Sequence, residues 1–387
     1  MNILFITWDG PQTNYLESLF LPIFSGLSSF GYNVHVLQFT WANSDRISET
    51  KSICQKNGIQ YRSAPIIRKF GGLGPLLSSL MGGRHIDRAV KDWNIDALMP
   101  RSLMPGLSVL VSKKSKLLRL IFDADGFVAD ERVDFGNLSR KSLVYRLLRK
   151  VEAQVTQNAD TVLVRTPKAI EILQERSGCS AEKFFVVTNG RDPAPYLEID
   201  QSRREREFTL CYAGSLGDKY CVDTMIDLAI SLRKHLPKLV FKVYTGDKNI
   251  LTKALDRAGI KCRSWIAVAR LQADQMPKAL MECDLGIVFI QSAFSTQGVV
   301  PIKLGEYMLA GLPVVGYIGS GAADKLVEEQ VFLSVKDDLG IVWPYVRDTV
   351  IPRRDELRAR AKGLGCDHFS LQSSVLSYAE ALKYERR

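Results

Sequence analysis

The stretch VVPIKLGEYMLAGLPVVGY, residues 299–317, places one lysine and one glutamate inside an otherwise apolar segment. Pro301 suits the start of a helix, because the first turn needs no N–H donor at that position. Gly311 is typical of the left-handed residue that follows a helix. Apolar runs at 285–290 and 314–317 have the length and composition of buried strands. The segment therefore predicts a strand–helix–strand unit of a parallel sheet.

Lys303 and Glu306 fall in the first two turns of the predicted helix. In parallel α/β sheets, ligands bind at the carboxyl ends of the strands, which the helix N-termini face. A lysine in a first turn opposes the helix dipole, and a phosphate bound there would remove the conflict. The carboxylate of Glu306 could accept two hydrogen bonds from a diol such as a ribose. The alternative interpretation is that both side chains are solvated at the surface.

Length and composition are those of a soluble globular protein with two domains: 387 residues, 46% hydrophobic and 24% charged. No apolar stretch is long enough to span a bilayer, and the N-terminal residues lack the pattern of a signal peptide. The seven cysteines are scattered without CxxC spacing, which argues against disulfides and zinc sites and suits a reducing cytoplasm. The four histidines are isolated, so we expect no metal site.

The net charge of +10 suggests a partner that is nucleic acid, an anionic membrane or a phosphorylated substrate. No nucleic-acid-binding motif is present, so we expect no nucleic-acid partner. The remaining expectations are an anionic membrane surface and a phosphorylated substrate. We therefore expect a cytoplasmic protein that is able to attach peripherally to the inner face of the cell membrane.

Apolar runs alternate with helical patterns in both halves of the chain, which predicts two parallel, doubly wound sheets. The predicted strands are 3–8, 34–38, 98–100, 118–122, 161–164, 184–187, 209–213, 240–244, 285–290 and 314–317. We expect an N-terminal domain over 1–190, a linker over 191–207, a C-terminal domain over 208–368 and a final helix over 369–387. That helix either closes the second domain or packs on the first. Two such domains would leave a ligand-binding cleft between their strand ends.

PIKLGEYMLAGLPVV, residues 301–315, resembles the signature of family 4 glycosyltransferases of the GT-B fold. Three further segments agree with that family in the same order: FDADGFVADERV at 122–133, VVTNGRD at 186–192 and CYAGSLGDKY at 211–220. The resemblance covers nearly the whole chain. It implies an α/β protein of two Rossmann-like, doubly wound domains that face each other across a cleft.

The resemblance also implies an activity. Members of the family transfer a sugar, mostly with retention, from a nucleotide-diphosphate sugar such as a UDP or GDP sugar. The implied acceptor is a lipid-linked or other saccharide of a bacterial surface polysaccharide, such as lipopolysaccharide, capsule or exopolysaccharide. The implied enzyme needs no cofactor and no metal.

The nucleotide sugar is expected in the second domain, with Glu306 on the ribose and Lys303, Ser215 and Lys219 on the diphosphate. The leaving diphosphate gains negative charge, so it must be neutralised. Gly214 falls between a strand and a helix, where backbone amides can face a phosphate. The alternative is that Gly214 only makes a tight turn and Lys219 is solvated. The predicted nucleotide-sugar-binding residues are Gly214, Ser215, Lys219, Ile266, Gly298, Val299, Val300, Lys303 and Glu306.

Two positions depart from the family pattern. Ser215 stands where many members carry an arginine, and Gly298 stands where many carry the first glutamate of a Glu-x7-Glu pair. Thr296, Gln297 or the amides of 298–300 are the candidate replacements for that glutamate. The departures motivate an alternative function, a non-catalytic nucleotide-sugar-binding subunit of a polysaccharide complex. A sugar-nucleotide epimerase of the same fold is a second alternative, and it would need several carboxylates and a histidine in the cleft.

Carboxylates in the first domain are the candidate acceptor-side residues. Asp123-Ala-Asp125 matches a metal-binding pattern of another glycosyltransferase fold, but we interpret both residues as cleft-facing catalytic carboxylates. Asp9 and Gly10, in the loop after the first strand, and Asp130 and Glu131 are predicted to bind the acceptor. The alternative for one or two of these carboxylates is helix capping.

A membrane-facing surface is predicted from residues 70–83, an apolar, glycine-rich segment expected to be a loop. Its flanking basic residues are Arg68, Lys69 and Arg84, and a helix predicted over 142–157 carries Arg146, Arg149 and Lys150 on one face. Basic residues beside exposed apolar ones suit a membrane interface. The alternative is a buried loop and a solvated helix face.

Overall fold

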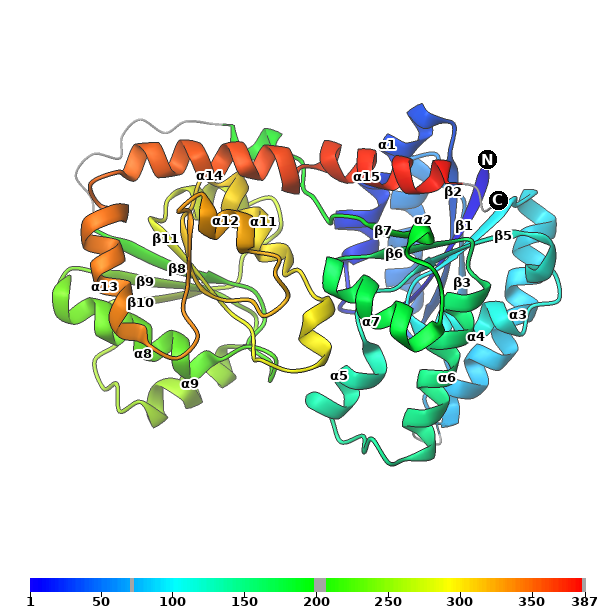
Figure 1. Ribbon diagram of the computed structural model, residues 1–387, viewed down its shortest axis with the longest axis horizontal. Coiled ribbons are helices and arrows are strands. Elements are labelled where there is room, and N and C mark those ends of the chain that lie inside the picture. The colour runs from blue at the N-terminus through cyan, green and yellow to red at the C-terminus, as the bar shows by residue number, and fades with distance from the viewer. Residues whose placement is uncertain (70–72, 198–206, 385–387) are drawn as a thin grey trace. The chain divides into compact units, whose positions relative to one another are not determined.

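The computed structural model describes residues 1–69, 73–197 and 207–384, and its chain divides into two compact units (Figure 1). The first unit comprises residues 1–188, 297–299 and 374–387. The second unit comprises residues 189–296 and 300–373. Most of the predicted linker, residues 198–206, lies outside the described residues.

The first unit is built on a seven-stranded sheet in the order β3-β2-β1-β4-β5-β6-β7, and all of its strand pairs are parallel. Its strands are β1 (Asn2–Asp9), β2 (Asn33–Thr40), β3 (Tyr61–Pro65), β4 (Ala97–Pro100), β5 (Arg119–Asp123), β6 (Thr161–Val164) and β7 (Phe184–Val186). The central strands are continuous apolar runs because helices cover both faces of the sheet (Figure 1).

The helices of the first unit begin and end at recognisable signals. Ser142 caps α6 by accepting a hydrogen bond from the Tyr145 amide, and Thr166 caps α7, which ends at Gly178 in the left-handed conformation. The helices are α1 (Leu21–Leu27), α2 (Ser44–Lys56), α3 (Leu73–Trp93), α4 (Leu103–Leu110), α5 (Val128–Asp134), α6 (Leu143–Asn158), α7 (Pro167–Ser177) and most of α15 (Leu371–Lys383).

Residues 73–83, expected to be a loop, form the first half of helix α3, so that prediction was wrong. Gly82 serves helix packing, because a Cβ at this position would lie 2.4 Å from the Ser108 hydroxyl of α4. Residues 70–72 lie outside the described residues.

Helix α15 is held on the first unit by buried polar contacts. Tyr378 has no exposed surface, and its hydroxyl accepts a hydrogen bond from Arg165 Nη2 at 3.3 Å. Arg119 Nη1 donates to the Leu382 carbonyl at 2.8 Å.

The second unit contains a six-stranded parallel sheet in the order β10-β9-β8-β11-β12-β13. Its strands are β8 (Thr209–Ala213), β9 (Val240–Tyr244), β10 (Ile266–Ala269), β11 (Leu285–Phe289), β12 (Val314–Tyr317) and β13 (Phe332–Ser334). Its helices are α8 (Val222–His235), α9 (Lys248–Arg257), α10 (Met276–Met281), α11 (Ile302–Leu309), α12 (Asp324–Glu328), α13 (Val342–Tyr345) and α14 (Arg354–Phe369).

The strand–helix–strand unit predicted around residues 299–317 is confirmed as β11, α11 and β12. Gly311 adopts the expected left-handed conformation, with φ +71°. Helix α11 packs closely on α14, where a Cβ at Gly365 would lie 2.6 Å from the Leu309 amide nitrogen. Within the described part of the chain, we find no helix with both the length and the apolar character needed to cross a membrane.

Candidate functional site

Lys303 of α11 is buried in the second unit between two tyrosines. Its side chain is enclosed, and Nζ donates a hydrogen bond to the Tyr212 hydroxyl at 2.6 Å. Nζ also lies 4.0 Å from the ring centroids of both Tyr212 and Tyr220. No carboxylate among the described residues forms an ion pair with it, and burial lowers the pKa of Lys303 to about 7. The interpretation of Lys303 as a solvated surface lysine was therefore wrong.

Gly214, which follows β8, lies against this ammonium. Its φ of +128° is unfavourable for other residues, and a Cβ there would lie 2.9 Å from Lys303 Nζ. The Gly214 amide is already used, because it donates to the Tyr244 carbonyl at 2.9 Å. The exposed Ser215 amide donates to no group among the described residues. The Ser215 amide and the Lys303 ammonium are thus the donors that a phosphate could use here.

Glu306, one turn further along α11, is paired with Arg191. Arg191 Nε donates to Glu306 Oε1 at 3.1 Å, and both side chains keep about a fifth of their surface exposed. The backbone of Arg191 is anchored in turn by its amide, which donates to the Phe369 carbonyl at 2.9 Å. The sequence analysis missed this pairing, although Arg191 belongs to the quoted segment 186–192.

The other predicted nucleotide-binding residues are divided between the two units. Lys219 accepts a backbone hydrogen bond from the Gln291 amide at 2.9 Å, Ile266 begins β10, and Val300 precedes α11. Gly298 and Val299 group instead with the first unit. There a Cβ at Gly298 would lie 3.0 Å from the Phe127 ring.

Asp123, at the end of β5, is a buried structural carboxylate. Its side chain is 0% exposed and accepts hydrogen bonds from Arg101 Nη1 at 3.0 Å and Arg165 Nη2 at 2.7 Å. The prediction that Asp123 is a cleft-facing carboxylate was therefore wrong, because the side chain has no exposed surface and both of its oxygens are held by arginines. Asp125 pairs with Arg101 Nη2 at 2.5 Å and remains 37% exposed. In the described residues, no three His, Cys, Asp or Glu side chains are arranged to hold a metal ion.

Asp130 is also buried, so its prediction as an acceptor-binding residue was wrong. It accepts hydrogen bonds from the Tyr145 hydroxyl at 2.8 Å and from Arg176 Nη1 at 2.9 Å. Glu131 follows it on α5 and is half-buried. Gly10 lies against Trp41, where a Cβ would approach the indole ring to 2.7 Å.

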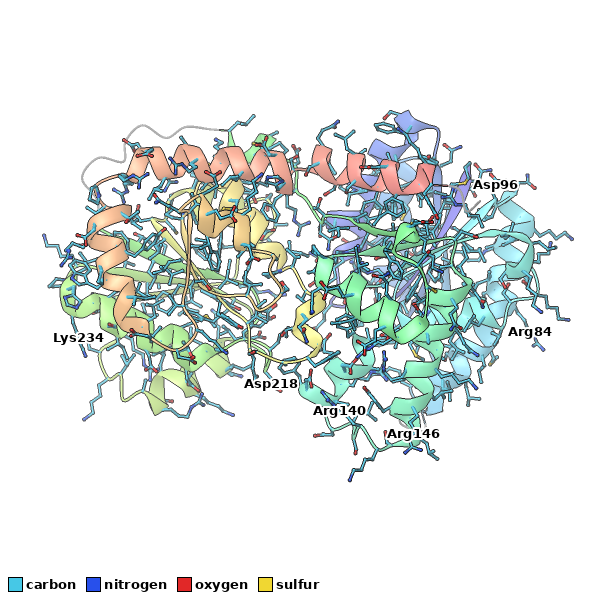
Figure 2. The ribbon with its side chains drawn as sticks, in the orientation of Figure 1. Arg84, Asp96, Arg140, Arg146, Asp218 and Lys234 are labelled. Atoms are coloured by element: carbon cyan, nitrogen blue, oxygen red, sulfur yellow. The ribbon has the colours of Figure 1, made fainter. Side chains whose placement is uncertain are left out.

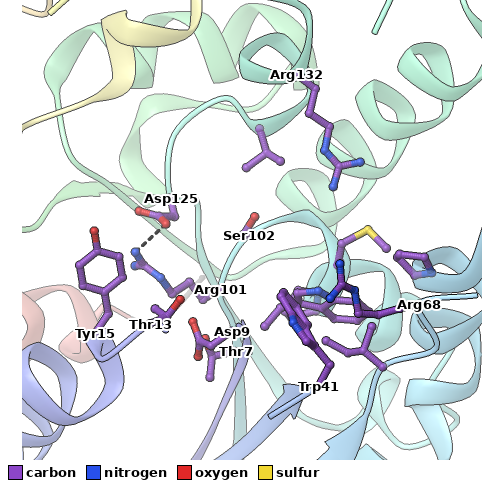
Figure 3. A pocket seen from close by; sticks show the side chains of 16 residues that line it. Thr7, Asp9, Thr13, Tyr15, Trp41, Arg68, Arg101, Ser102, Asp125 and Arg132 are labelled. Carbon is purple, nitrogen blue, oxygen red and sulfur yellow. Dashed lines mark hydrogen bonds and ion pairs between the residues drawn. The ribbon is translucent and has the colours of Figure 1, made fainter. Parts of the chain in front are cut away.

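A pocket of about 460 Å³ opens in the first unit beside the ends of β1 and β4 (Figure 3). Two predicted residues, Asp9 and Asp125, line it. Asp9 Oδ2 accepts hydrogen bonds from the Thr7 hydroxyl at 2.8 Å and from Gln38 Nε2 at 3.1 Å. Burial raises the pKa of Asp9. The remaining lining residues are Thr7, Trp8, Thr13, Tyr15, Trp41, Ile66, Arg68, Pro75, Arg101, Ser102, Met104, Pro105, Val128 and Arg132.

Most of this lining was missed in the sequence because it comes from six separate segments of the chain. Arg101 had a usable signal, since it directly follows strand β4 at the carboxyl edge of the sheet. Arg68 was assigned to the membrane surface, Arg132 belongs to the quoted segment 122–133 but was given no role, and nothing in the local sequence distinguishes Trp41.

The chain resembles one curated protein along part of its length. It is 24% identical over 224 residues to a probable glycosyltransferase of Pseudomonas aeruginosa, WbjE. The match covers 54% of this chain and 52% of that relative, so the chain matches about half the length of the curated protein. No protein-family profile matches the chain.

Solved structures resemble the chain over its full length. Anabaena Alr3699/HepE in complex with UDP has a TM-score of 0.71 at 16% identity, and 99% of each chain is covered. WaaG, a glycosyltransferase involved in lipopolysaccharide biosynthesis, has a TM-score of 0.70 at 18% identity over 98% of this chain and 99% of that one. UDP-GlcNAc 2-epimerase from Neisseria meningitidis scores lower, at 0.62 with 10% identity and 99% coverage of both chains. The chain therefore has the fold predicted from its sequence, two Rossmann-like α/β domains of the GT-B type.

Proposed function

We propose that this protein is a glycosyltransferase that moves a sugar, with retention, from a nucleotide-diphosphate sugar to an acceptor of a bacterial surface polysaccharide. The observation that carries the proposal is the position of Lys303. A buried ammonium beside an exposed backbone amide is an arrangement suited to a diphosphate, because both groups stabilise the charge that develops on the leaving group. Glu306 lies one turn away and would accept the ribose hydroxyls.

UDP is the nucleotide that we propose first. The support is that HepE, which shares the fold, is known in complexes with UDP and with UDP-glucose. WaaG acts in lipopolysaccharide biosynthesis, which supports a lipid-linked saccharide as the acceptor class.

In the proposed reaction, the bond between the anomeric carbon and the diphosphate oxygen breaks. The acceptor oxygen forms a new bond on the same face of the sugar, and its proton passes to the departing phosphate. Lys303 and the Ser215 amide hold that phosphate. The negative charge of the phosphate raises the pKa of Lys303, so the lysine is protonated while the phosphate is bound. The structural carboxylates of the first unit take no proton in this scheme.

We further propose that the first unit docks on an anionic membrane. The docking surface, here called the α3–α6 face, combines exposed apolar and exposed basic side chains on two helices that both pack on α4. Leu77, Leu80 and Met81 of α3 are 45%, 46% and 52% exposed, and Leu143 at the start of α6 is 80% exposed. Figure 2 shows Arg84 and Arg146 pointing outward from this unit. Such a surface fits lipid headgroups and the upper acyl region.

Arg149, counted in the sequence as part of this surface, does not belong to the α3–α6 face. It forms an ion pair with the buried Glu152 and is only partly exposed. Lys150, its neighbour, is exposed and remains part of the face.

The alternative of a sugar-nucleotide epimerase is less well supported. Asp9 and Asp125 supply carboxylates to the pocket of the first unit, but its lining contains no histidine among the described residues. A non-catalytic subunit would bind a nucleotide sugar without releasing the nucleoside diphosphate, whereas a transferase would release it.

The proposed function is tested with a panel of UDP, GDP and ADP sugars. We expect the purified protein to release the nucleoside diphosphate slowly from at least one UDP sugar, and a Glu306→Ala variant to lose that release. Stabilisation by a nucleotide sugar without any release would indicate the non-catalytic subunit instead. A ligand at a hundred times its dissociation constant stabilises the folded state by about 2.7 kcal/mol, so thermal shifts report binding independently of turnover.

A further inference from the structure

The pocket of the first unit carries two arginines whose charge no ion pair with a described residue neutralises. Arg68 and Arg132 both line it and are exposed, and no carboxylate pairs with either guanidinium in the described part of the chain. Arg101 differs, since Asp123 and Asp125 hold it on both sides. The lining contains three arginines and two aspartates, which leaves a formal surplus of one positive charge.

Arg68 is also held in position. Its guanidinium lies 5.1 Å from the ring centroid of Trp41, a contact that limits its freedom without satisfying its charge. Figure 3 shows Arg68 and Arg132 toward one side of the pocket, with Tyr15, Thr13 and Asp125 toward the other. The pocket thus has a cationic side and a side with hydroxyl and carboxylate groups.

We propose that the cationic side binds the phosphate or diphosphate group of a phosphate-linked lipid acceptor. The inference rests on the proposed function and names the class of acceptor for it. Guanidinium groups present paired N–H donors that match phosphate oxygens, which makes arginine suited to this group. A volume of about 460 Å³ is in the range of small-molecule sites, so it has room for a sugar as well as a phosphate.

Exposed apolar residues of α3 follow the pocket lining and could contact the lipid portion of such an acceptor. Pro75, in the first turn of α3, belongs to the pocket lining. Leu77 and Leu80, a few residues further along that helix, are exposed and form part of the α3–α6 face. A phosphate bound by Arg68 and Arg132 would therefore have an apolar, membrane-suited surface close to it, which favours a lipid phosphate over a free one.

Asp9 is suited to position the acceptor sugar. Its Oδ2 is fixed by Thr7 and Gln38, and Gln38 is fixed in turn by the Tyr61 hydroxyl at 2.7 Å. Its other oxygen, Oδ1, accepts no hydrogen bond among the described residues. This oxygen is therefore available to accept a hydrogen bond from an acceptor hydroxyl.

The test is direct binding to the pocket without any nucleotide. Trp8 and Trp41 line the pocket, so their fluorescence reports occupancy. The probes are farnesyl diphosphate, farnesyl phosphate, farnesol, inorganic diphosphate and octyl glucuronide, all below their micellar concentrations. The test variant is Arg68→Gln/Arg132→Gln. The control is Arg88→Gln/Lys91→Gln, which removes the same charge from exposed positions of α3 outside the lining.

We expect both farnesyl phosphates to bind more tightly than farnesol and inorganic diphosphate. The test variant should lose about tenfold or more in affinity for them, as the loss of a charged hydrogen bond predicts, while the control binds normally. The proposal is overturned if no phosphate-bearing probe binds the folded protein or if farnesol binds as tightly as its phosphates. It is also overturned if the test variant binds the farnesyl phosphates as tightly as the wild type does, or if the wild type binds octyl glucuronide more tightly than the farnesyl phosphates. Release of the nucleoside diphosphate from a sugar nucleotide is measured in a separate assay. A failure of that assay would overturn the proposed function without changing the outcome of this binding test.

Discussion

The Lys303 ammonium donates a 2.6 Å hydrogen bond to the Tyr212 hydroxyl, and the same hydroxyl donates to the Ser215 carbonyl. Tyr212 thereby connects the first turn of α11 to the loop after β8. No carboxylate in the described chain forms an ion pair with this lysine. Burial keeps its pKa near 7, so a bound phosphate would determine its protonation.

Nucleotide binding should be coupled to proton uptake by Lys303. The free protein has a lysine pKa of about 7, and a neighbouring diphosphate raises it. Affinity should therefore be highest below pH 7 and should fall as the pH rises above it, until the higher pKa of the complex is passed. Calorimetry of UDP binding near pH 8 in buffers of different ionisation enthalpy measures the uptake. Proton release, or affinity that increases between pH 7 and 9, would contradict this role.

Gly214→Ala should weaken nucleotide binding and destabilise the second unit. A Cβ at this position combines an unfavourable φ of +128° with a 2.9 Å approach to Lys303 Nζ. Strain of this kind typically destabilises a protein by about 1–3 kcal/mol. Gly217→Ala is the matched control in the same loop, because no atom lies within 4 Å of its added Cβ. Thermal unfolding and UDP titration should separate the two variants, and equal behaviour would show that neither the φ of Gly214 nor its close approach to Lys303 has a consequence.

Glu306→Gln should reduce nucleotide affinity by about one to two decades, because a charged hydrogen bond contributes about 1.5–3 kcal/mol. Arg191→Gln breaks the same ion pair but leaves the carboxylate available to a ribose. We therefore expect Arg191→Gln to have the smaller effect on UDP affinity. If the two variants weaken UDP equally, Glu306 acts through its contact with Arg191 and not on the nucleotide.

The α3–α6 face should bind anionic liposomes at low salt. Replacement of Leu77, Leu80 and Met81 by serine, or of Arg84, Arg146 and Lys150 by glutamine, should abolish sedimentation with them. Each basic residue near an anionic surface contributes about 1 kcal/mol, which salt screens. Serine at Ile250, Val327 and Ile351, which are 42%, 40% and 45% exposed in the second unit, is the control. Wild-type protein that stays in the supernatant would exclude this surface as a membrane site.

Much of the fold could be predicted from apolar periodicity, and the exceptions have a common cause. The three strands missing from the prediction, β3, β10 and β13, all lie at the edges of their sheets. Edge strands pair on one side only and need no continuous apolar run, as Tyr61–Pro65 illustrates with its arginine, serine and proline.

The candidate site was predictable only where local sequence determines position. The location of Lys303 and Glu306 on α11 followed from helix signals, but the burial of Lys303 depends on Tyr212 and Tyr220, more than eighty residues earlier in the chain. Asp123 and Asp130 were misassigned for the same reason. Their partners Arg165 and Arg176 come from distant segments, and only the fold shows that these carboxylates are already paired.

The central claim, that Lys303 holds the nucleotide diphosphate, is tested most directly by Lys303→Met. UDP titration should show at least about a tenfold loss of affinity, as expected when a charged hydrogen bond is lost. The thermal midpoint of the unliganded variant should be equal to or higher than that of the wild type, because an unpaired buried cation is replaced by an apolar side chain of similar length. Lys278→Met, at an exposed position of α10, should change neither quantity. A folded Lys303→Met variant that binds UDP with wild-type affinity would contradict the account.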